Sequence, residues 1–225
     1  MEDPFPEMVD GRRSTPDPNV KAIPWWTVVA AGTAPVLLIG GFFVATAMQP
    51  ASYNPVRDTI SELAERGATD SWVMTSALAG LGLCFPVAAL GLQPAARVGR
   101  VLLAGGAVAT LLIAVFREPP HGYSFAHELA VIAATLTCCA WPVLASHRLH
   151  PALLLTRTPS LAAGGVSLGL ATWYALESHG ALVGLAERCA AAAPPLWLLA
   201  VVVTTRRALT QCPASHDAPG GETTA

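Results

Sequence analysis

The sequence predicts an all-α fold: an integral membrane bundle of six transmembrane helices, with a short interfacial helix in the first outer loop. Six long apolar stretches divide the 225 residues, and most Lys and Arg residues lie on one side of them. The chain is 53% hydrophobic and only 12% charged, whereas a soluble domain carries about 25% charged residues. One membrane domain therefore accounts for most of the chain.

The spans follow from length, because about 20 apolar residues cross a bilayer as a helix. The lipid core offers no partner to an unpaired backbone group, so each spanning segment must be helical. Two stretches, 25–47 and 71–92, contain no charged residue. The other four have charged residues at their ends and cover about 98–116, 127–146, 158–176 and 184–205.

The membrane domain is expected to cover residues 25–207, between two polar tails. Residues 1–24 are acidic, rich in proline and without apolar periodicity, which is typical of a disordered segment. Residues 208–225 are predicted to form a second disordered tail. One membrane domain accounts for nearly all of the remaining chain, so no further domain is expected.

The basic residues predict the orientation. Of the 13 Lys and Arg residues, nine fall in the two tails and in the turns near residues 93–100 and 147–157. The other four lie on the opposite side: Arg57, Arg66, Arg117 and Arg188. The positive-inside rule then places both termini in the cytoplasm, with the chain in the plasma (inner) membrane. A net charge of −2 gives no reason to expect a nucleic-acid partner.

The first outer loop, residues 48–70, contains a predicted short helix. Thr59 and Glu62 fit a capping box, in which each satisfies a free backbone donor near the other. Glu62 and Arg66 are spaced to pair on one helical face, and Gly67 is a suitable stop. The helix is either a lid that closes the bundle or one wall of a pocket.

A candidate polar cluster lies on the outer face. Ionisable residues at membrane depth are costly, so they usually pair or serve a function. Arg188 opens the sixth span, where the helix dipole disfavours a cation, so we expect a carboxylate partner for it: Glu62, Glu118 or Glu128. The candidate cluster consists of Ser61, Glu62, Arg117, Glu118, His127, Glu187 and Arg188.

The spacing of the histidines and cysteines does not match a metal site, and no cofactor is expected. Gly165 and Gly169 form a GxxxG pattern on the fifth span. Such a pattern favours close packing within the bundle, and a homodimer through Gly165 and Gly169 is the alternative.

Three short motifs resemble the domain-of-unknown-function family 998 of bacterial multi-pass membrane proteins, over about residues 25–207. The first is Thr59-Ile60-Ser61-Glu62-Leu63, followed by a glycine and then Trp72. The second is Phe116-Arg117-Glu118-Pro119 with His127, and the third is Gly184-Leu185-Ala186-Glu187-Arg188 followed by Leu196-Trp197. The resemblance implies a six-span membrane protein and brings no activity with it.

Three functions fit the sequence. The first is a non-enzymatic membrane protein that binds a lipid headgroup or a partner at the outer recess. The second is an intramembrane hydrolase or lipid-modifying enzyme that uses His127 with an outer carboxylate. The third is a small transporter, which would need polar groups or broken helices near the midplane. The sequence leaves open whether the protein is an enzyme.

Overall fold

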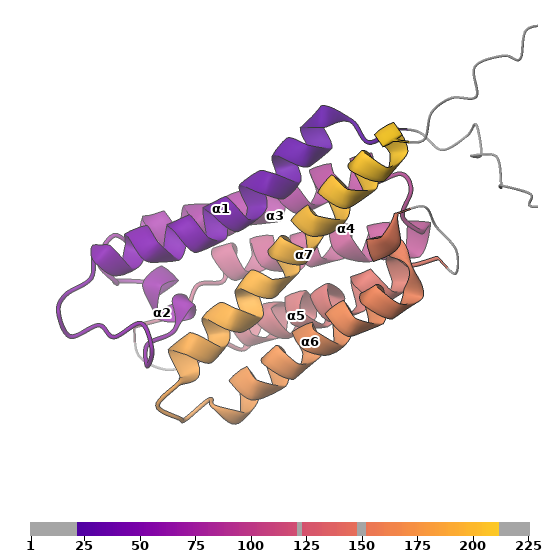
Figure 1. The fold of residues 1–225 in the computed structure, drawn as a ribbon. Coiled ribbons are helices and arrows are strands. Elements are labelled where there is room, and N and C mark those ends of the chain that lie inside the picture. Colours follow the sequence, from indigo (N-terminus) through magenta and orange to yellow (C-terminus); the bar gives the residue numbers. More distant parts are fainter. Residues whose placement is uncertain (1–21, 121–122, 148–151, 212–225) are drawn as a thin grey trace, which may run out of the picture.

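The structure, a computed structural model, describes residues 22–120, 123–147 and 152–211 (Figure 1). The predicted tails 1–24 and 208–225 lie largely outside these ranges. The described residues form seven α-helices and one 3₁₀ turn. In chain order they are α1 (Trp25–Ala47), α2 (Ile60–Ala64), α3 (Ser71–Gly91), α4 (Arg97–Val115), α5 (Phe125–Ala145), η1 (Leu153–Leu155), α6 (Arg157–Leu176) and α7 (Val183–Gln211).

Six long helices are arranged in a ring. Each packs against the next in the order α1, α3, α4, α5, α6, α7, and α7 returns to α1 (Figure 1). The start of α1 and the end of α7 lie at one end of the bundle, which we call the tail end. The short helix α2 lies at the opposite end, which we call the α2 end.

Five helices are long and apolar enough to cross a membrane: α1, α3, α4, α5 and α7. The predicted fifth span is a helix of 20 residues, α6, but it is not among the five. It carries Arg157, several hydroxyl side chains and three glycines, which lower its hydropathy. The all-helical, multi-pass character is confirmed by the five apolar helices. The predicted span bounds agree with the helix bounds to within a few residues, except that α7 continues to Gln211.

Several hydroxyl groups inside the long helices donate to their own backbone, whereas those of Thr27, Thr46 and Thr205 are buried without a partner. Thr110 donates to Gly106 O at 2.9 Å, Thr137 to Ala133 O at 2.7 Å, and Thr204 to Ala200 O at 2.7 Å. This satisfies the hydroxyl without a partner on another helix. These groups are therefore compatible with a lipid environment.

Small residues let several helices approach closely. A Cβ atom on Gly41 would overlap Ala77, and one on Gly99 would overlap the backbone of Ala145, so α1 meets α3 and α4 meets α5 at these points. By contrast, no described atom lies within 4 Å of a Cβ position on Gly165 or Gly169. The expectation that this pair packs inside the bundle is therefore wrong, because its face of α6 is exposed.

The predicted loop helix exists, but it is shorter than the sequence suggested. Thr59 Oγ1 accepts from the backbone N–H of Glu62 at 3.1 Å, which confirms the helix cap. The helix ends at Ala64, since Glu65 already has an extended backbone. Arg66 therefore lies beyond the helix and cannot form the expected pair with Glu62 along one helical face. Gly67 has a φ of 102°, a conformation that favours glycine.

Candidate functional site

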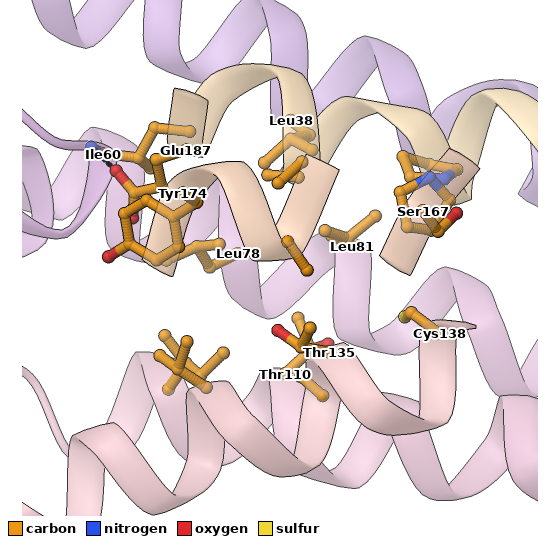
Figure 2. Close-up of a pocket in the computed structure, with 18 of the residues that line it drawn as sticks. Leu38, Ile60, Leu78, Leu81, Thr110, Thr135, Cys138, Ser167, Tyr174 and Glu187 are labelled. Carbon is orange, nitrogen blue, oxygen red and sulfur yellow. Dashed lines mark hydrogen bonds between the residues drawn. The ribbon is translucent and has the colours of Figure 1, made fainter. Parts of the chain in front are cut away.

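A mostly apolar cavity lies inside the ring of helices, and every long helix contributes to its wall (Figure 2). Glu187 and Pro194, both on α7, line it seven residues apart, which corresponds to a depth of about 10 Å at 1.5 Å per residue. Leu78 and Phe85 on α3 give the same depth. The cavity therefore spans about a third of a hydrocarbon core that is about 30 Å thick.

The two ends of the cavity differ. At the α2 end it is lined by Ile60, Ser61, Tyr174 and Glu187. Beyond Pro195, one turn further along α7, Leu198 is fully buried, and on α5 Trp141 follows the lining residues Cys138 and Cys139 and is only 1% exposed. The carboxylate of Glu187 and the phenol of Tyr174 thus lie at the α2 end, the hydroxyls of Thr110, Thr135 and Ser167 line the cavity further along, and packed apolar side chains close the other end.

Glu187 anchors the polar end of the cavity. Its Oε2 atom accepts a hydrogen bond from the backbone N–H of Ile60, and its Oε1 atom accepts from Ser61 Oγ at 3.0 Å. One backbone N–H and one hydroxyl of α2 therefore fix the Glu187 side chain, although α2 and α7 are far apart in the sequence.

Ser61 connects Glu187 to His127. The Ser61 Oγ atom lies 3.3 Å from His127 Nε2, and His127 Nδ1 lies 2.9 Å from the carbonyl oxygen of Phe116. A carbonyl only accepts, so Nδ1 must carry a hydrogen. Glu118 Oε1 lies 3.8 Å from the same Nε2 atom of His127. His127 is only 2% exposed and does not line the cavity. It therefore contacts Ser61 from outside the cavity wall.

Arg188 has a different set of partners from the one expected. Its Nη1 atom donates to the carbonyl oxygens of Pro55, Asp58 and Gly184 at 2.7, 2.8 and 2.9 Å. Its Nη2 atom donates to the phenol oxygen of Tyr53 at 2.6 Å. The prediction of a carboxylate partner was wrong, because carbonyl dipoles and a phenol satisfy the buried guanidinium instead.

The same contacts tie the loop of residues 48–59 to α7. The backbone N–H of Leu185 donates to Val56 O at 3.1 Å, and Tyr53 donates to the carbonyl of Thr59 at 2.9 Å. Burial raises the pKa of Tyr53 above its usual value of 10.0, although Arg188 opposes the shift. The phenol thus stays neutral and can both donate and accept. The loop is therefore held over the bundle by Arg188.

The other two residues of the candidate cluster lie apart from this network. Glu62 is on the exposed side of α2, where partial burial of its carboxyl, and secondly the neighbouring Asp58, raise its pKa. Arg117 Nη1 donates to Ser71 Oγ at 3.3 Å, at the start of α3. The structure therefore brings together Ser61, Glu118, His127 and Glu187, with Arg188 beside them on α7.

Two residues that the sequence did not single out belong to this region. Tyr53 orients Arg188, and Tyr174 forms part of the cavity wall beside Glu187 (Figure 2). Neither carries a sequence signal, because single tyrosines near a membrane interface are common. Within the ranges that the structure describes, no group of three or more His, Cys, Asp or Glu side chains is arranged to hold a metal ion.

The apolar helices and their arrangement define a multi-pass membrane protein. The chain belongs to the DUF998 family, described as proteins of unknown function, whose sequence model matches residues 28–204. This confirms the resemblance drawn from the three short motifs. No curated protein and no solved structure matches the chain significantly.

Proposed function

We propose that this protein is a six-span membrane protein that binds a lipid, with the lipid chain in the central cavity and its polar head beside Glu187. The cavity carries the proposal: it is mostly apolar along its length, with hydroxyls of Thr110, Thr135 and Ser167 in its wall, and the Glu187 carboxylate lies at its α2 end. A lipid has the same division into an apolar chain and a polar head. Binding sites of this kind are mainly hydrophobic, with a few placed polar groups.

The six-span arrangement rests on α6. At 1.5 Å per residue, its 20 residues reach about 30 Å, which matches the hydrocarbon core. It also completes the ring between α5 and α7, so it shares their depth in the bilayer. With both termini cytoplasmic in the plasma membrane, the α2 end and the cavity's polar end face outward. The basic residues at the tail end, such as Arg97 and Arg206, support this orientation.

Labelling of introduced cysteines tests the topology. In a variant whose native cysteines are replaced, His179→Cys and Arg57→Cys should react with a membrane-impermeant maleimide on intact cells. Thr158→Cys should react only after the membrane is permeabilised. Reaction of positions 158 and 179 from the same side would show that α6 does not cross.

A cavity-filling substitution tests lipid binding. Ala190 lines the cavity, whereas Ala162 is exposed on α6. Ala190→Phe should exclude a photoreactive fatty-chain probe from the cavity, and crosslinks to α5 and α7 peptides should disappear. Ala162→Phe is the matched control and should leave these crosslinks unchanged. Equal crosslinking in both variants would contradict a lipid site in the cavity.

An intramembrane hydrolase or lipid-modifying enzyme is the second candidate. The contact of Ser61 with His127 favours it, because a histidine beside a cavity-lining hydroxyl resembles a nucleophile with its base. However, the hydroxyl lies closer to Glu187 than to His127, and a hydroxyl donates only once. Loss of lipid-ester turnover in both Ser61→Ala and His127→Ala, with lipid binding retained, would favour the enzyme.

A homodimer through Gly165 and Gly169 remains a further proposal. Their exposed face on α6 supports it, since two copies of a GxxxG face pack closely in lipid. The transporter has less support, because the cavity ends at packed side chains such as Leu198 rather than continuing toward the tail end.

A further inference from the structure

The charge balance around Glu187 indicates which kind of head the cavity takes. A carboxylate in an apolar environment is costly unless it is paired. Within residues 22–120, 123–147 and 152–211, no basic side chain lies within ion-pair distance of the Glu187 carboxylate, and the carboxylate that lies near a histidine is Glu118, beside His127. Glu187 is instead held by neutral donors from Ile60 and Ser61. The Glu187 carboxylate thus has no cation in direct contact.

The carboxylate also keeps accepting capacity toward the cavity. A carboxylate offers about four lone-pair positions. The backbone N–H of Ile60 and the Ser61 hydroxyl account for two donors, both from α2. Since Glu187 lines the cavity, a donor on a bound molecule can reach a remaining position.

Arg188 does not turn this site into a receptor for anions. Its guanidinium is 8% exposed and is bonded to three carbonyl oxygens and to Tyr53. It does not line the cavity. A phosphate or carboxylate head would therefore meet the Glu187 carboxylate without an accessible counter-charge, and like charges at short range repel.

Tyr174 adds an aromatic surface on the same side. Figure 2 shows its ring beside Glu187 at the polar end of the cavity. The face of an aromatic ring attracts cations. A carboxylate and an aromatic ring at one end of an apolar cavity are together complementary to an ammonium group that carries an apolar chain.

We propose that the head bound beside Glu187 is a primary amine, so that the cavity holds an amine-bearing amphiphile by its chain and pairs its ammonium group with Glu187. This inference rests on the proposed function and specifies its ligand class. The ammonium donates to a remaining Glu187 position and lies against the Tyr174 ring. The chain extends about 10 Å toward Pro194, the depth of the cavity.

Three probes with the same ten-carbon chain test the proposal: n-decylamine, n-decanol and n-decanoate. Binding to the full-length protein in a nonionic detergent is measured by native mass spectrometry and by thermal shift. We expect decylamine to bind about tenfold more tightly than decanol, because a charge-assisted hydrogen bond contributes that much. We expect decanoate to bind least.

Variants locate the preference. Glu187→Gln should remove the amine preference but keep chain binding, and Tyr174→Leu should weaken the preference without disturbing the α2 contacts. Glu128→Gln is the control, because that carboxyl is exposed on α5 and does not line the cavity, and it should keep the preference. If Glu187→Gln does not fold, the wild-type probe series and Tyr174→Leu still test whether the cavity prefers the amine.

The outcomes separate the two proposals. Equal binding of all three probes, each blocked by Ala190→Phe, would overturn the amine inference and leave the lipid cavity standing. An amine preference that persists in Glu187→Gln and Tyr174→Leu would also overturn it. No binding by any probe, or binding that Ala190→Phe does not affect, would overturn the proposed function itself.

Discussion

The hydroxyl oxygen of Ser61 lies 3.0 Å from Oε1 of Glu187, although 126 positions separate the two residues in the chain. The same oxygen lies 3.3 Å from Nε2 of His127, at the start of α5. One side chain on the short helix α2 therefore joins three segments at the α2 end. Its hydroxyl fixes the carboxylate that forms the polar end of the cavity.

Ser61→Ala should destabilise the protein by about 1 kcal/mol, the usual net contribution of one hydrogen bond. For a chain of this size the thermal midpoint should fall by about 2–4 °C. Thermal unfolding in a fixed detergent measures the change. Ser76→Ala is the control, because that hydroxyl is exposed and bonds only to carbonyls of its own helix. A similar loss in both variants would contradict the role given to Ser61.

Arg188→Met should be much more harmful, because Met retains an apolar chain but removes the guanidinium that donates to three carbonyl oxygens and to the Tyr53 phenol. We expect a loss of about 3 kcal/mol, the upper value for hydrogen bonds to a charged group. Limited proteolysis of residues 48–59 should also become faster as the loop detaches from α7. Arg57→Met, at an exposed position in the same loop, should change stability by less than about 0.5 kcal/mol.

The long helices could be predicted because lipid imposes a simple rule. Every backbone group in the hydrocarbon core must be satisfied within its own segment, so apolar length alone identifies a helix. Residues 25–47 were predicted as a span, and α1 has these bounds. The sequence predicts α6 as a span less clearly, because Arg157 and the hydroxyl side chains of α6 lower the hydropathy on which the rule depends.

The site could be predicted only in part. Ionisable residues next to spans drew attention to His127 and Glu187, and the predicted loop helix drew attention to Ser61; the structure brings the three together. The partners of Arg188 were not predictable, since backbone carbonyls are the same at every residue and leave no trace in the sequence. The cavity was also not predictable, because its wall of Ala, Leu and Pro has the composition of ordinary packing.

Alkaline pH should expose the role of Tyr53. Burial raises its pKa in the folded protein, so above pH 10 the unfolded chain loses this proton more readily than the folded one. Stability should therefore fall as the pH rises from its ordinary pKa of 10.0 toward the raised value. Tyr53→Phe should make the thermal midpoint less sensitive to pH between 9 and 11. Tyr123→Phe is the control, because Tyr123 is exposed. If the thermal midpoint of Tyr53→Phe depended on pH as strongly as that of Tyr123→Phe, this would argue against a buried, neutral phenol at position 53.

The docking of the first loop onto α7 should also fail when a single methyl group is added at Gly184. A Cβ atom there would overlap the carbonyl oxygen of Asp58 and would lie 2.9 Å from Arg188 Nη1. Because the obstacle is backbone, the loop must move away, and Ile60 and Ser61 then lose their contact with Glu187. In Gly184→Ala we expect both a lower thermal midpoint and weaker binding of the fatty-chain probe. Gly169→Ala introduces the same methyl group where no described atom lies within 4 Å, so it should preserve both properties. If Gly184→Ala bound the probe as well as Gly169→Ala does, the loop contacts would not shape the cavity's polar end.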